Sequence, residues 1–407
     1  MNNILYDEYI FLSGIFTSKM QKSLIDPKKN RNIQVAADTL QKHIIAGLEK
    51  NLNRPIKLLN VPFIGASPMK CKVPYVHGSR IANMTEKHTY NIGFLNFPLI
   101  RQISIYRQIC RKLDKWAGCK KKCVVIAYAM TARNVCELVH VKKHNPSVKT
   151  CLIVPDLPMH MRMKQGKIYK FFKFFEIKLI KRNLKKIDSY VLLTEYMNEF
   201  VNSENYCVVE GVASSKEFST IQHVIKDERE KIIFYSGTLD EKYGILILLE
   251  AFMRMKEENY RLYICGQGDC QKKVLDAERK DKRINYLGQK SHEEVLKYQQ
   301  GATLLVNPRQ NIGEFTRYSF PSKNLEYLSS GIPMVAYKLD GIPKEYDKYI
   351  LYINENTVDS MKEKMEEVLK YSDEKREKIG LDARRFVLSE KSDVAQTKKI
   401  LDMISNL

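Results

Sequence analysis

The chain has 407 residues, of which 44% are hydrophobic and 28% are charged. This composition is ordinary for a soluble globular protein and excludes a mostly disordered chain, and the length predicts two domains with separate cores. The formal net charge of +21 favours an anionic partner, which is nucleic acid, a phosphorylated substrate or an anionic membrane surface.

The sequence predicts no zinc site, no signal peptide and no membrane span. The nine cysteines form no CxxC pair, and no second pair of Cys or His lies near Cys119 and Cys123 to complete a zinc site. We therefore expect reduced thiols and no bound metal. The first residues carry Asp7 and Glu8 without a basic segment, so they do not predict a signal peptide. No apolar run reaches the roughly 20 residues of a membrane span, and we expect a cytoplasmic protein.

Short apolar runs alternate with helical patterns in the first half of the chain. This alternation predicts a parallel sheet in an α/β domain over residues 1–213. Residues 123–129 are almost wholly apolar, as in a strand that is covered on both faces. A helix is expected at 35–48, and strands are expected at 4–12, 56–61, 92–97, 123–129, 150–154, 189–194 and 206–210.

The pattern restarts after a polar segment, 214–229, which we interpret as a linker. Residues 230–385 predict a second Rossmann-like domain, and residues 386–407 predict a terminal helix that can return to the first domain. The expected strands are 232–235, 261–265, 284–287, 303–307 and 333–337, and the expected helices are 246–255, 293–300 and 323–330. The prediction is an α/β fold in which two parallel sheets face a central cleft, where open α/β sheets bind ligands.

One predicted helix of the second domain has the features of an anion site. Pro321 stands where the helix is expected to begin. The first-turn N–H groups of Ser322, Lys323 and Asn324 lack intrahelical partners, and the helix dipole favours an anion there. Glu326 lies one turn deeper on the same face, roughly 6 Å away, where its carboxylate can accept from two ribose hydroxyls. These residues predict a nucleotide diphosphate site.

The segment FPSKNLEYLSSGIPMVAY, residues 320–337, resembles the donor-binding signature of the family-four retaining glycosyltransferases of GT-B fold. It is especially similar to the branch that builds bacterial capsular and exopolysaccharides. The resemblance implies a transferase that uses a nucleotide-diphosphate sugar, UDP before GDP, and needs no further cofactor. It also implies an acceptor-binding first domain and a saccharide acceptor. The alternative from another class is a non-catalytic nucleotide-sugar-binding subunit.

The sequence departs from the family pattern in its glutamates. The family usually carries two glutamates separated by seven residues. Glu326 matches the second, but Tyr318 stands at the first position, and Glu314 lies four residues earlier. The role of the first glutamate, which contacts the transferred sugar, is therefore assigned to Tyr318 or Glu314.

A second departure concerns the cations that clamp the diphosphate. The family loop Gly-Arg…Lys-Gly is replaced here by Gly237, Thr238 and a displaced Lys242. Arg309 and Arg317 flank the loop before the helix and can supply the missing charge, because Arg binds phosphate in a bidentate manner. Glycines that follow strands complete the expected donor site: Gly14, which lets the backbone approach a diphosphate, with Gly266 and Gly288.

The first domain is expected to supply the acceptor side. Asp156 follows a strand and is best placed to orient the acceptor or to act as a base if its pKa is suitable. His160 corresponds to a His that faces the transferred sugar in many relatives, and Thr131 and Arg133 follow another strand. With no nucleophile identified, a front-face displacement is the economical hypothesis, in which the leaving phosphate helps deprotonate the incoming hydroxyl. A covalent intermediate stays an alternative.

Residues 164–186 predict a basic helix with aromatic residues among the cations. This composition is typical of an interfacial membrane helix, and each cation near an anionic leaflet is worth ~1 kcal/mol. The expected membrane-facing residues are Lys167, Lys170, Phe171, Phe174, Lys178, Lys181 and Arg182, whereas Ile168, Phe172, Phe175, Leu179 and Ile180 are expected in the core. A peripheral protein on the inner face of the bacterial plasma membrane, with a lipid-linked acceptor, fits this pattern. Nucleic-acid binding lacks any accompanying motif, and a solvated face is the remaining alternative.

Overall fold

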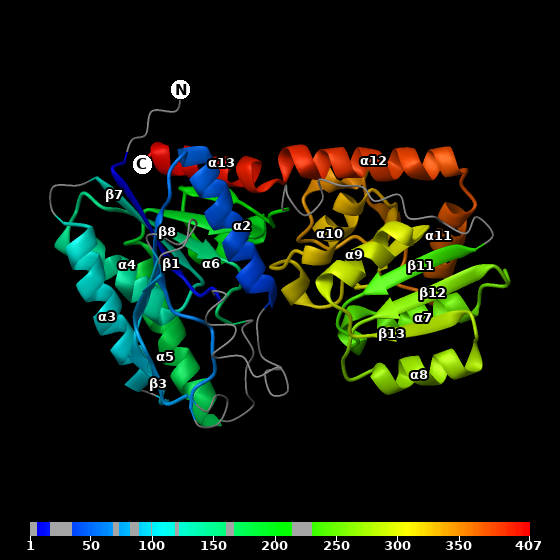
Figure 1. Ribbon diagram of the computed structural model, residues 1–407, viewed down its shortest axis with the longest axis horizontal. Coiled ribbons are helices and arrows are strands. Elements are labelled where there is room, and N and C mark those ends of the chain that lie inside the picture. The colour runs from blue at the N-terminus through cyan, green and yellow to red at the C-terminus, as the bar shows by residue number, and fades with distance from the viewer. Residues whose placement is uncertain are drawn as a thin grey trace. The chain divides into compact units, whose positions relative to one another are not determined.

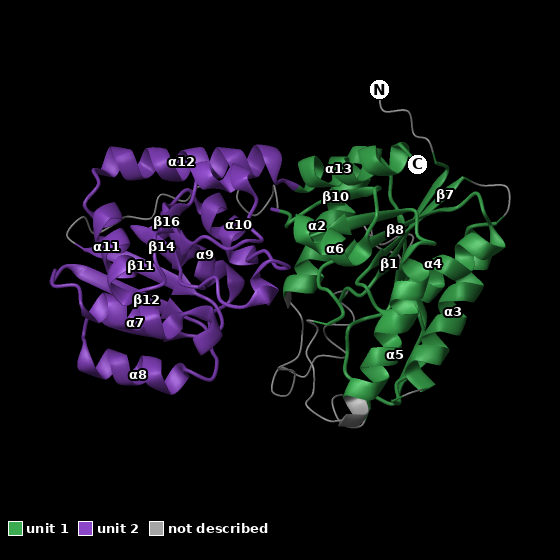
Figure 2. Cartoon of the chain, turned by 180° about the vertical axis from the view of Figure 1, so that it is seen from behind, with its two compact units in different colours: residues 1–212, 393–407 green, residues 213–392 purple. Residues whose placement is uncertain are grey.

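The computed structural model describes residues 6–16, 35–67, 73–81, 89–98, 100–118, 122–159, 167–213 and 230–407. The chain forms two compact α/β units (Figures 1 and 2). The first contains Met1–Val212 and Asp393–Leu407, and the second contains Ala213–Ser392. His160, the side chain of Lys167 and the expected linker 214–229 lie outside the described residues.

The first unit is built on an eight-stranded sheet. Its order is β10-β9-β8-β7-β1-β2-β5-β4, and neighbouring strands are parallel except for β4 and β5. The strands are β1 Glu8–Ser13, β2 Lys57–Asn60, β4 Ser79–Ile81, β5 Thr89–Asn91, β7 Cys123–Tyr128, β8 Lys149–Val154, β9 Ser189–Leu192 and β10 Tyr206–Val208. A separate antiparallel pair is formed by β3 Tyr75–Val76 and β6 Phe94–Leu95.

Helices cover both faces of this sheet (Figure 1). One layer is α2 Val35–Leu52 and α13 Asp393–Ser405, and the other is α3 Ile100–Trp116, α4 Ala132–His144 and α5 Lys167–Leu184. Strand side chains alternate between the faces, so Val124 and Ile126 pack with α2 and α13, and Val125 and Ala127 are buried on the opposite face. This double cover confirms the interpretation of residues 123–129. Short helices follow β9: η1 Glu195–Met197 and α6 Asn198–Val201.

The strand that was expected at 92–97 is wrong in position. The sheet strand is β5, three residues earlier, and only residues 94–95 of the apolar run form a strand, β6. Thr89 and Asn91 of β5 are polar but buried, and Asn91 accepts a hydrogen bond from Asn60 Nδ2 at 2.9 Å. Buried polar residues such as Thr89 and Asn91 do not show the apolar pattern on which the prediction relied.

The second unit has a fully parallel six-stranded sheet in the order β13-β12-β11-β14-β15-β16. The strands are β11 Lys231–Ser236, β12 Tyr260–Cys265, β13 Ile284–Gly288, β14 Leu304–Asn307, β15 Met334–Tyr337 and β16 Leu351–Ile353. The strand order reverses between β11 and β14. Ligands of such sheets bind at this switch point, beyond the carboxyl ends of the strands.

Two helical layers enclose this second sheet. One contains α7 Ile245–Met253, α8 Gln271–Lys280 and α11 Val358–Leu369, and the other contains α9 His292–Gly301, α10 Ser322–Ser330 and α12 Asp373–Glu390. Short 3-10 turns complete the connections: η2 Glu241–Tyr243, η3 Glu314–Thr316 and η4 Lys344–Lys348. Both units therefore have the Rossmann-like α/β architecture that the sequence predicts.

The C-terminal segment differs from the single helix expected at 386–407. Helix α12 ends at Glu390 and α13 begins at Asp393. The intervening Lys391 is wholly buried and pairs with Glu345, which holds the chain in place at the break. Helix α13 then packs on α2 so closely that a Cβ added to Gly47 would lie 2.1 Å from the carbonyl oxygen of Asp393.

Candidate functional site

Loops at the carboxyl ends of β11, β12 and β13 bond directly to one another. The N–H of Gly237 donates to Cys265 O at 3.0 Å, and the N–H of Gly266 donates to Gly288 O at 2.9 Å. Gly266 has φ +141°, and a Cβ added there would lie 1.9 Å from Gly237 O. The three glycines of the second domain that the sequence assigns to the donor site therefore lie together, and close packing requires Gly266.

The turn after β11 continues into η2 and reaches the end of β14. Gly244 closes η2 with φ +79°, and a Cβ added to it would lie 1.9 Å from Pro308 O. Thr238 and Lys242 are exposed on this turn, and Lys242 Nζ lies 4.9 Å from the ring centre of Tyr243. Both residues of the altered family loop are thus accessible to a ligand.

Arg309 follows β14 and is half-buried between two aromatic rings. Its Cζ lies 5.9 Å from the ring centre of Tyr243 and 5.2 Å from that of Phe315, and its Nη2 donates to Ser319 Oγ at 2.8 Å. Within the part of the chain that the structure describes, no carboxylate pairs with Arg309 and its buried Nε has no hydrogen-bond partner. Burial lowers the pKa of Arg309. A desolvated cation without an acid partner favours an anionic ligand.

The segment between η3 and α10 contains the two candidates for the missing first glutamate. Glu314 is exposed at the start of η3, whereas Tyr318 is half-buried. The guanidinium carbon of Arg317 lies 5.9 Å from the ring centre of Tyr318. Arg317 and Tyr318 therefore lie side by side just before α10, and Glu314 lies at the other end of the same short loop.

The first turn of α10 has two N–H groups available for an anion. Ser322 is exposed and Lys323 is half-exposed at the helix start. The expectation for the N–H of Asn324 is wrong, because this group donates to Pro321 O at 2.9 Å. The Asn324 side chain is wholly buried, and its Oδ1 accepts from Asn307 Nδ2 at 2.7 Å. Asn324 thus joins the helix start to the end of β14, while Ser322 and Lys323 face solvent.

Glu326 is held by two donors. Lys323 Nζ lies 2.9 Å from Glu326 Oε1 and 3.1 Å from Oε2, and Gln299 Nε2 on α9 donates to Oε1. The Glu326 side chain is 19% exposed. A carboxylate has about four acceptor positions, so Glu326 retains capacity for a hydroxyl donor. No sequence motif indicates Gln299, although Val295 one turn earlier on α9 marks the buried face on which Gln299 lies.

Tyr327 connects α10 by a hydrogen bond to the end of β11, at the point where the strand order reverses. Its side chain is wholly buried, and its hydroxyl oxygen accepts from the N–H of Ser236 at the end of β11, at 2.8 Å. Burial raises the pKa of Tyr327, so the phenol stays protonated at neutral pH. This bond holds the middle of α10 next to the strand end that leads into Gly237 and Thr238.

The first unit places Gly14 at its own switch point, between β1 and β7. A Cβ added to Gly14 would lie 2.4 Å from the ring of Phe63, and the N–H of Gly14 donates to Gln41 Oε1 at 2.7 Å. Packing against Phe63 therefore accounts for this glycine, and its N–H already has a partner. Ala129 at the end of β7 has φ +82°, a strained conformation for a residue with a side chain.

Asp156 follows β8 near the same edge of the sheet. Its side chain keeps access to solvent, but partial burial of the carboxyl group raises its pKa. Burial and the charge of Asp156 raise the pKa of Tyr128 at the end of β7. Two other candidates have structural partners, because Thr131 caps α4 and Arg133 pairs with the buried Glu137 at 3.5 Å. Asp156 thus keeps its side chain accessible beyond the end of β8.

The exposed surface of α5 is more apolar than expected. The exposed fractions are 61% for Phe171 and 63% for Phe174, but also 60% for Phe172 and 50% for Phe175. The core assignment of Phe172, Phe175 and Leu179 is therefore wrong, whereas that of Ile180 is confirmed. The buried stripe contains Ile180 with Lys173 and Leu184, and the side chain of Ile168 lies outside the described residues.

Lys173 lies in the buried face of α5, where the sequence predicted phenylalanines. Lys173 Nζ donates to Glu176 Oε2 at 2.8 Å, so the helix can bury Lys173 with its charge satisfied. The cations Lys170, Lys178, Lys181 and Arg182 are exposed on the same helix as the phenylalanines. No helix among the described residues is long and apolar enough to cross a membrane.

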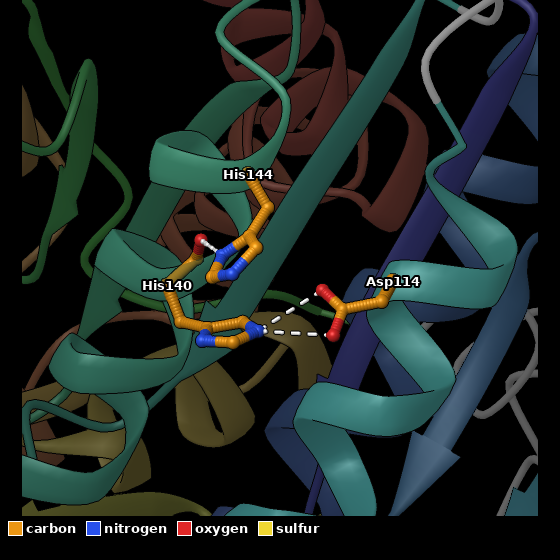
Figure 3. Close-up of side chains that lie close together, drawn as sticks. All are labelled: Asp114, His140 and His144. Atoms are coloured by element: carbon orange, nitrogen blue, oxygen red, sulfur yellow. Dashed lines mark hydrogen bonds and ion pairs between the residues drawn. The ribbon is translucent and has the colours of Figure 1, made fainter.

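Around α10, the described residues include no cluster of metal-binding side chains. The group of such side chains that the structure does bring together is Asp114 on α3 with His140 and His144 on α4 (Figure 3). This group belongs to the first unit.

Residues 217–386 match the family model described as glycosyl transferases group 1. No curated protein matches the chain. Solved structures match almost all of it, although at low sequence identity. HepE of Anabaena, in a complex with UDP, has 11% identity and a TM-score of 0.66, with 98% of this chain and 100% of that chain covered.

Two further structures extend this likeness. A glycosyltransferase from Rickettsia africae has 12% identity and a TM-score of 0.66, with 98% of this chain and 99% of that chain covered. The lipopolysaccharide outer core galactosyltransferase WaaB has 14% identity and a TM-score of 0.60, with 98% and 100% covered. The whole chain thus has the GT-B fold, and the match to the group 1 glycosyl transferase model falls in its second unit.

Proposed function

We propose that the chain is a retaining glycosyltransferase of the family-four type, which moves a sugar from a nucleotide-diphosphate sugar to a lipid-linked saccharide in bacterial surface polysaccharide synthesis. The observation that carries this proposal is the surroundings of α10. Arg309 has no acid partner among the described residues, and Glu326 lies one turn into the helix with acceptor capacity to spare. A nucleoside diphosphate satisfies both groups at once.

The diphosphate is assigned to the start of α10. The N–H groups of Ser322 and Lys323 supply donors at the positive end of the helix dipole. Arg309 supplies a guanidinium already oriented by Ser319, so little further ordering is needed when phosphate binds. Lys323 Nζ now contacts both oxygens of Glu326, and it can move to a phosphate oxygen while Gln299 keeps its bond to the carboxylate.

The ribose hydroxyls are assigned to Glu326. Movement of Lys323 to the phosphate frees acceptor positions on Oε2 for the two vicinal hydroxyls. The glycines at the ends of β11, β12 and β13 leave room for the rest of the donor. UDP is the favoured nucleotide because the structure of the similar HepE contains it, with GDP as the competing choice.

Transfer proceeds with retention in this account. The bond between the anomeric carbon and the phosphate oxygen breaks, and a bond to the acceptor oxygen forms on the same face of the sugar. The acceptor proton passes to an oxygen of the leaving phosphate. Arg309, Lys323 and the helix start stabilise the charge that develops there. Tyr318 contacts the transferred sugar in place of the usual first glutamate, and Asp156 orients the acceptor.

The exposed surface of α5 supports the proposal that the protein binds a membrane, where a lipid-linked acceptor would be located. Four phenylalanines are half to two-thirds exposed among exposed cations. Ile100 and Ile103 at the start of α3 are also exposed, by 52% and 56%. Both helices run from the carboxyl edge of the sheet, so their first turns lie at the edge where Asp156 lies. Apolar side chains among cations suit an anionic bilayer surface, here the inner face of the plasma membrane.

Thermal unfolding of the full chain with UDP, GDP and their sugar conjugates tests the donor assignment. A nucleotide at 100 times its dissociation constant stabilises the protein by about 2.7 kcal/mol. We expect UDP or UDP-sugars to give the largest shift in Tm and Glu326→Ala to abolish it. Absence of stabilisation by any nucleoside diphosphate would overturn the proposal.

The second candidate function is a non-catalytic subunit that binds a nucleotide sugar. Tyr318, in the place of an acid that contacts the transferred sugar, is the observation that favours it. Incubation of UDP-sugars with the protein and bacterial membranes distinguishes the two functions. Transfer of labelled sugar to lipid indicates the enzyme, whereas tight binding without transfer or hydrolysis indicates the subunit.

A further inference from the structure

Three side chains with metal-binding chemistry meet where α3 packs on α4 (Figure 3). His140 Nε2 lies 3.0 and 3.2 Å from the two carboxylate oxygens of Asp114. His144 follows His140 by one helical turn, and their ring centres are 4.1 Å apart. One ligand atom from each of the three residues fits within 4.8 Å. Spacing by four residues places both rings on one face of α4, opposite Asp114.

The hydrogen bonds around His144 prepare one of its nitrogens for a metal. Its Nδ1 lies 2.9 Å from the carbonyl oxygen of His140. A carbonyl oxygen only accepts, so Nδ1 carries the proton, and Nε2 of the neutral ring has a free lone pair. Metal-ligating histidines usually donate their other N–H to a carbonyl or carboxylate in this way.

We propose that Asp114, His140 and His144 bind one divalent transition-metal ion, for which Zn²⁺ is the best match. Imidazole nitrogen and carboxylate oxygen are ordinary zinc ligands, whereas Mg²⁺ and Ca²⁺ prefer oxygen alone. The ion replaces the proton shared by His140 Nε2 and Asp114. The Asp114 side chain is 44% exposed and that of His140 19%, so water can fill the fourth position and the ion has a route from solvent.

The ion would connect two helices that pack on each other. Ile105, Ile109 and Leu113 of α3 are buried, and Asp114 is the next residue, on the exposed side of the same helix. Because the site exists only when α3 is packed on α4, an ion bound there stabilises the folded first unit. The site is thus a structural clamp in the first unit, and it is independent of the donor assignment.

Titration of chelator-treated full-length protein with Zn²⁺ tests the proposal by calorimetry and thermal unfolding. We expect binding of one equivalent at this site and a rise in Tm that saturates with it. Co²⁺ in its place is expected to give visible absorption bands of low-coordinate nitrogen and oxygen ligation. Mg²⁺ is expected to leave Tm unchanged.

Single variants separate a metal site from a simple ion pair. His144→Ala removes a ligand but keeps the bond between His140 and Asp114, so it tests the ion directly. We expect His144→Ala and His140→Ala each to weaken Zn²⁺ binding by more than about tenfold. The exposed His77→Ala is the control and should bind as the wild type does. The proposal is overturned if the wild type binds no Zn²⁺, or if His144→Ala leaves the affinity and the Tm rise unchanged.

Discussion

The wholly buried side-chain amide of Gln299 on α9 donates a hydrogen bond to the carboxylate of Glu326 on α10. The carboxylate therefore has one wholly buried partner and one partly exposed partner, Lys323, whose side chain is 34% exposed. In the proposed donor complex, Gln299 orients Glu326 for the ribose while Lys323 changes partners. Gln299 is thus a positioning residue that does not itself contact the donor.

Gln299→Leu is expected to weaken UDP binding by about tenfold. A hydrogen bond to a charged group contributes about 1.5–3 kcal/mol, and part of that orients Glu326. Calorimetric titration with UDP measures the effect. The matched control is Gln396→Leu, because Gln396 is also wholly buried and donates to a carboxylate, that of Glu210, at 3.3 Å in the first unit. Gln396→Leu should lower the stability of the protein without changing its affinity for UDP. Equal affinities of Gln299→Leu and Gln396→Leu for UDP would contradict the role of Gln299.

Arg309→Met is expected to weaken UDP binding by more than tenfold without lowering the Tm of the ligand-free protein. Arg309 is a desolvated cation that lacks an acid partner among the described residues, so its removal avoids the free-energy cost of burying an unpaired charge. Methionine can fill the space between Tyr243 and Phe315. Thermal unfolding with and without UDP measures both effects.

Arg384→Met is the control for that variant. Arg384 is also buried in the second unit, but its Nη1 donates to Ser329 O at 3.1 Å. We expect this variant to lower the Tm and to bind UDP normally. A ligand-free Arg309→Met protein that is as destabilised as Arg384→Met would show that Arg309 is structural.

Glu137→Gln is expected to change the pH dependence of stability. Burial raises the pKa of Glu137 to about 7, above the value of about 4.5 in an unfolded chain. Between these values the folded state keeps a proton that the unfolded state loses, so stability falls as pH rises. The fall is at most about 3 kcal/mol at 1.36 kcal/mol per pKa unit.

Urea denaturation at pH 5 and pH 8 measures this effect. The variant has no carboxyl group to titrate at this position, so its stability relative to the wild type should increase from pH 5 to pH 8. The exposed Glu390→Gln serves as the control. If the difference in free energy of unfolding between Glu137→Gln and the wild type is the same at pH 5 and pH 8, Glu137 does not titrate in this range.

Replacement of Phe171 and Phe174 by Ser is expected to reduce binding to anionic liposomes by at least tenfold. Each buried aromatic side chain contributes about 1.5–3 kcal/mol, and both are more than 60% exposed in the free protein. Co-sedimentation measures binding. Met253→Ser in the second unit, where Met253 is 40% exposed, is the control. Wild-type binding that is equally absent from anionic and neutral liposomes would contradict the membrane assignment.

Sequence patterns predicted those parts of the fold in which local signals and tertiary packing agree. The apolar run of β7 and the Pro321 start of α10 are examples. The pattern failed for β5, because Thr89 and Asn91 are buried polar residues. It also failed for part of the buried face of α5, where Lys173 is buried and Phe172 and Phe175 are exposed, although Ile180 is buried as expected.

In the candidate site too, local sequence spacing is predictable and contacts between distant segments are not. The sequence predicts that Lys323 and Glu326 lie close together, because their spacing on one helix is local. Nothing in the sequence indicates that Arg309 lies between the rings of Tyr243 and Phe315, since Tyr243 is distant along the chain. The bond from Gln299 to Glu326 depends on how α9 packs on α10, which no periodicity encodes.

Hydrogen exchange with and without UDP tests the assignment of the diphosphate to the start of α10, because it reports where the nucleotide binds. A peptide that spans residues 319–326 contains the N–H groups of Ser322 and Lys323. We expect saturating UDP to slow exchange in this peptide in the wild type, and Glu326→Ala to abolish the protection. UDP binding that leaves the exchange of this peptide unchanged would contradict the assignment of the diphosphate to the start of α10.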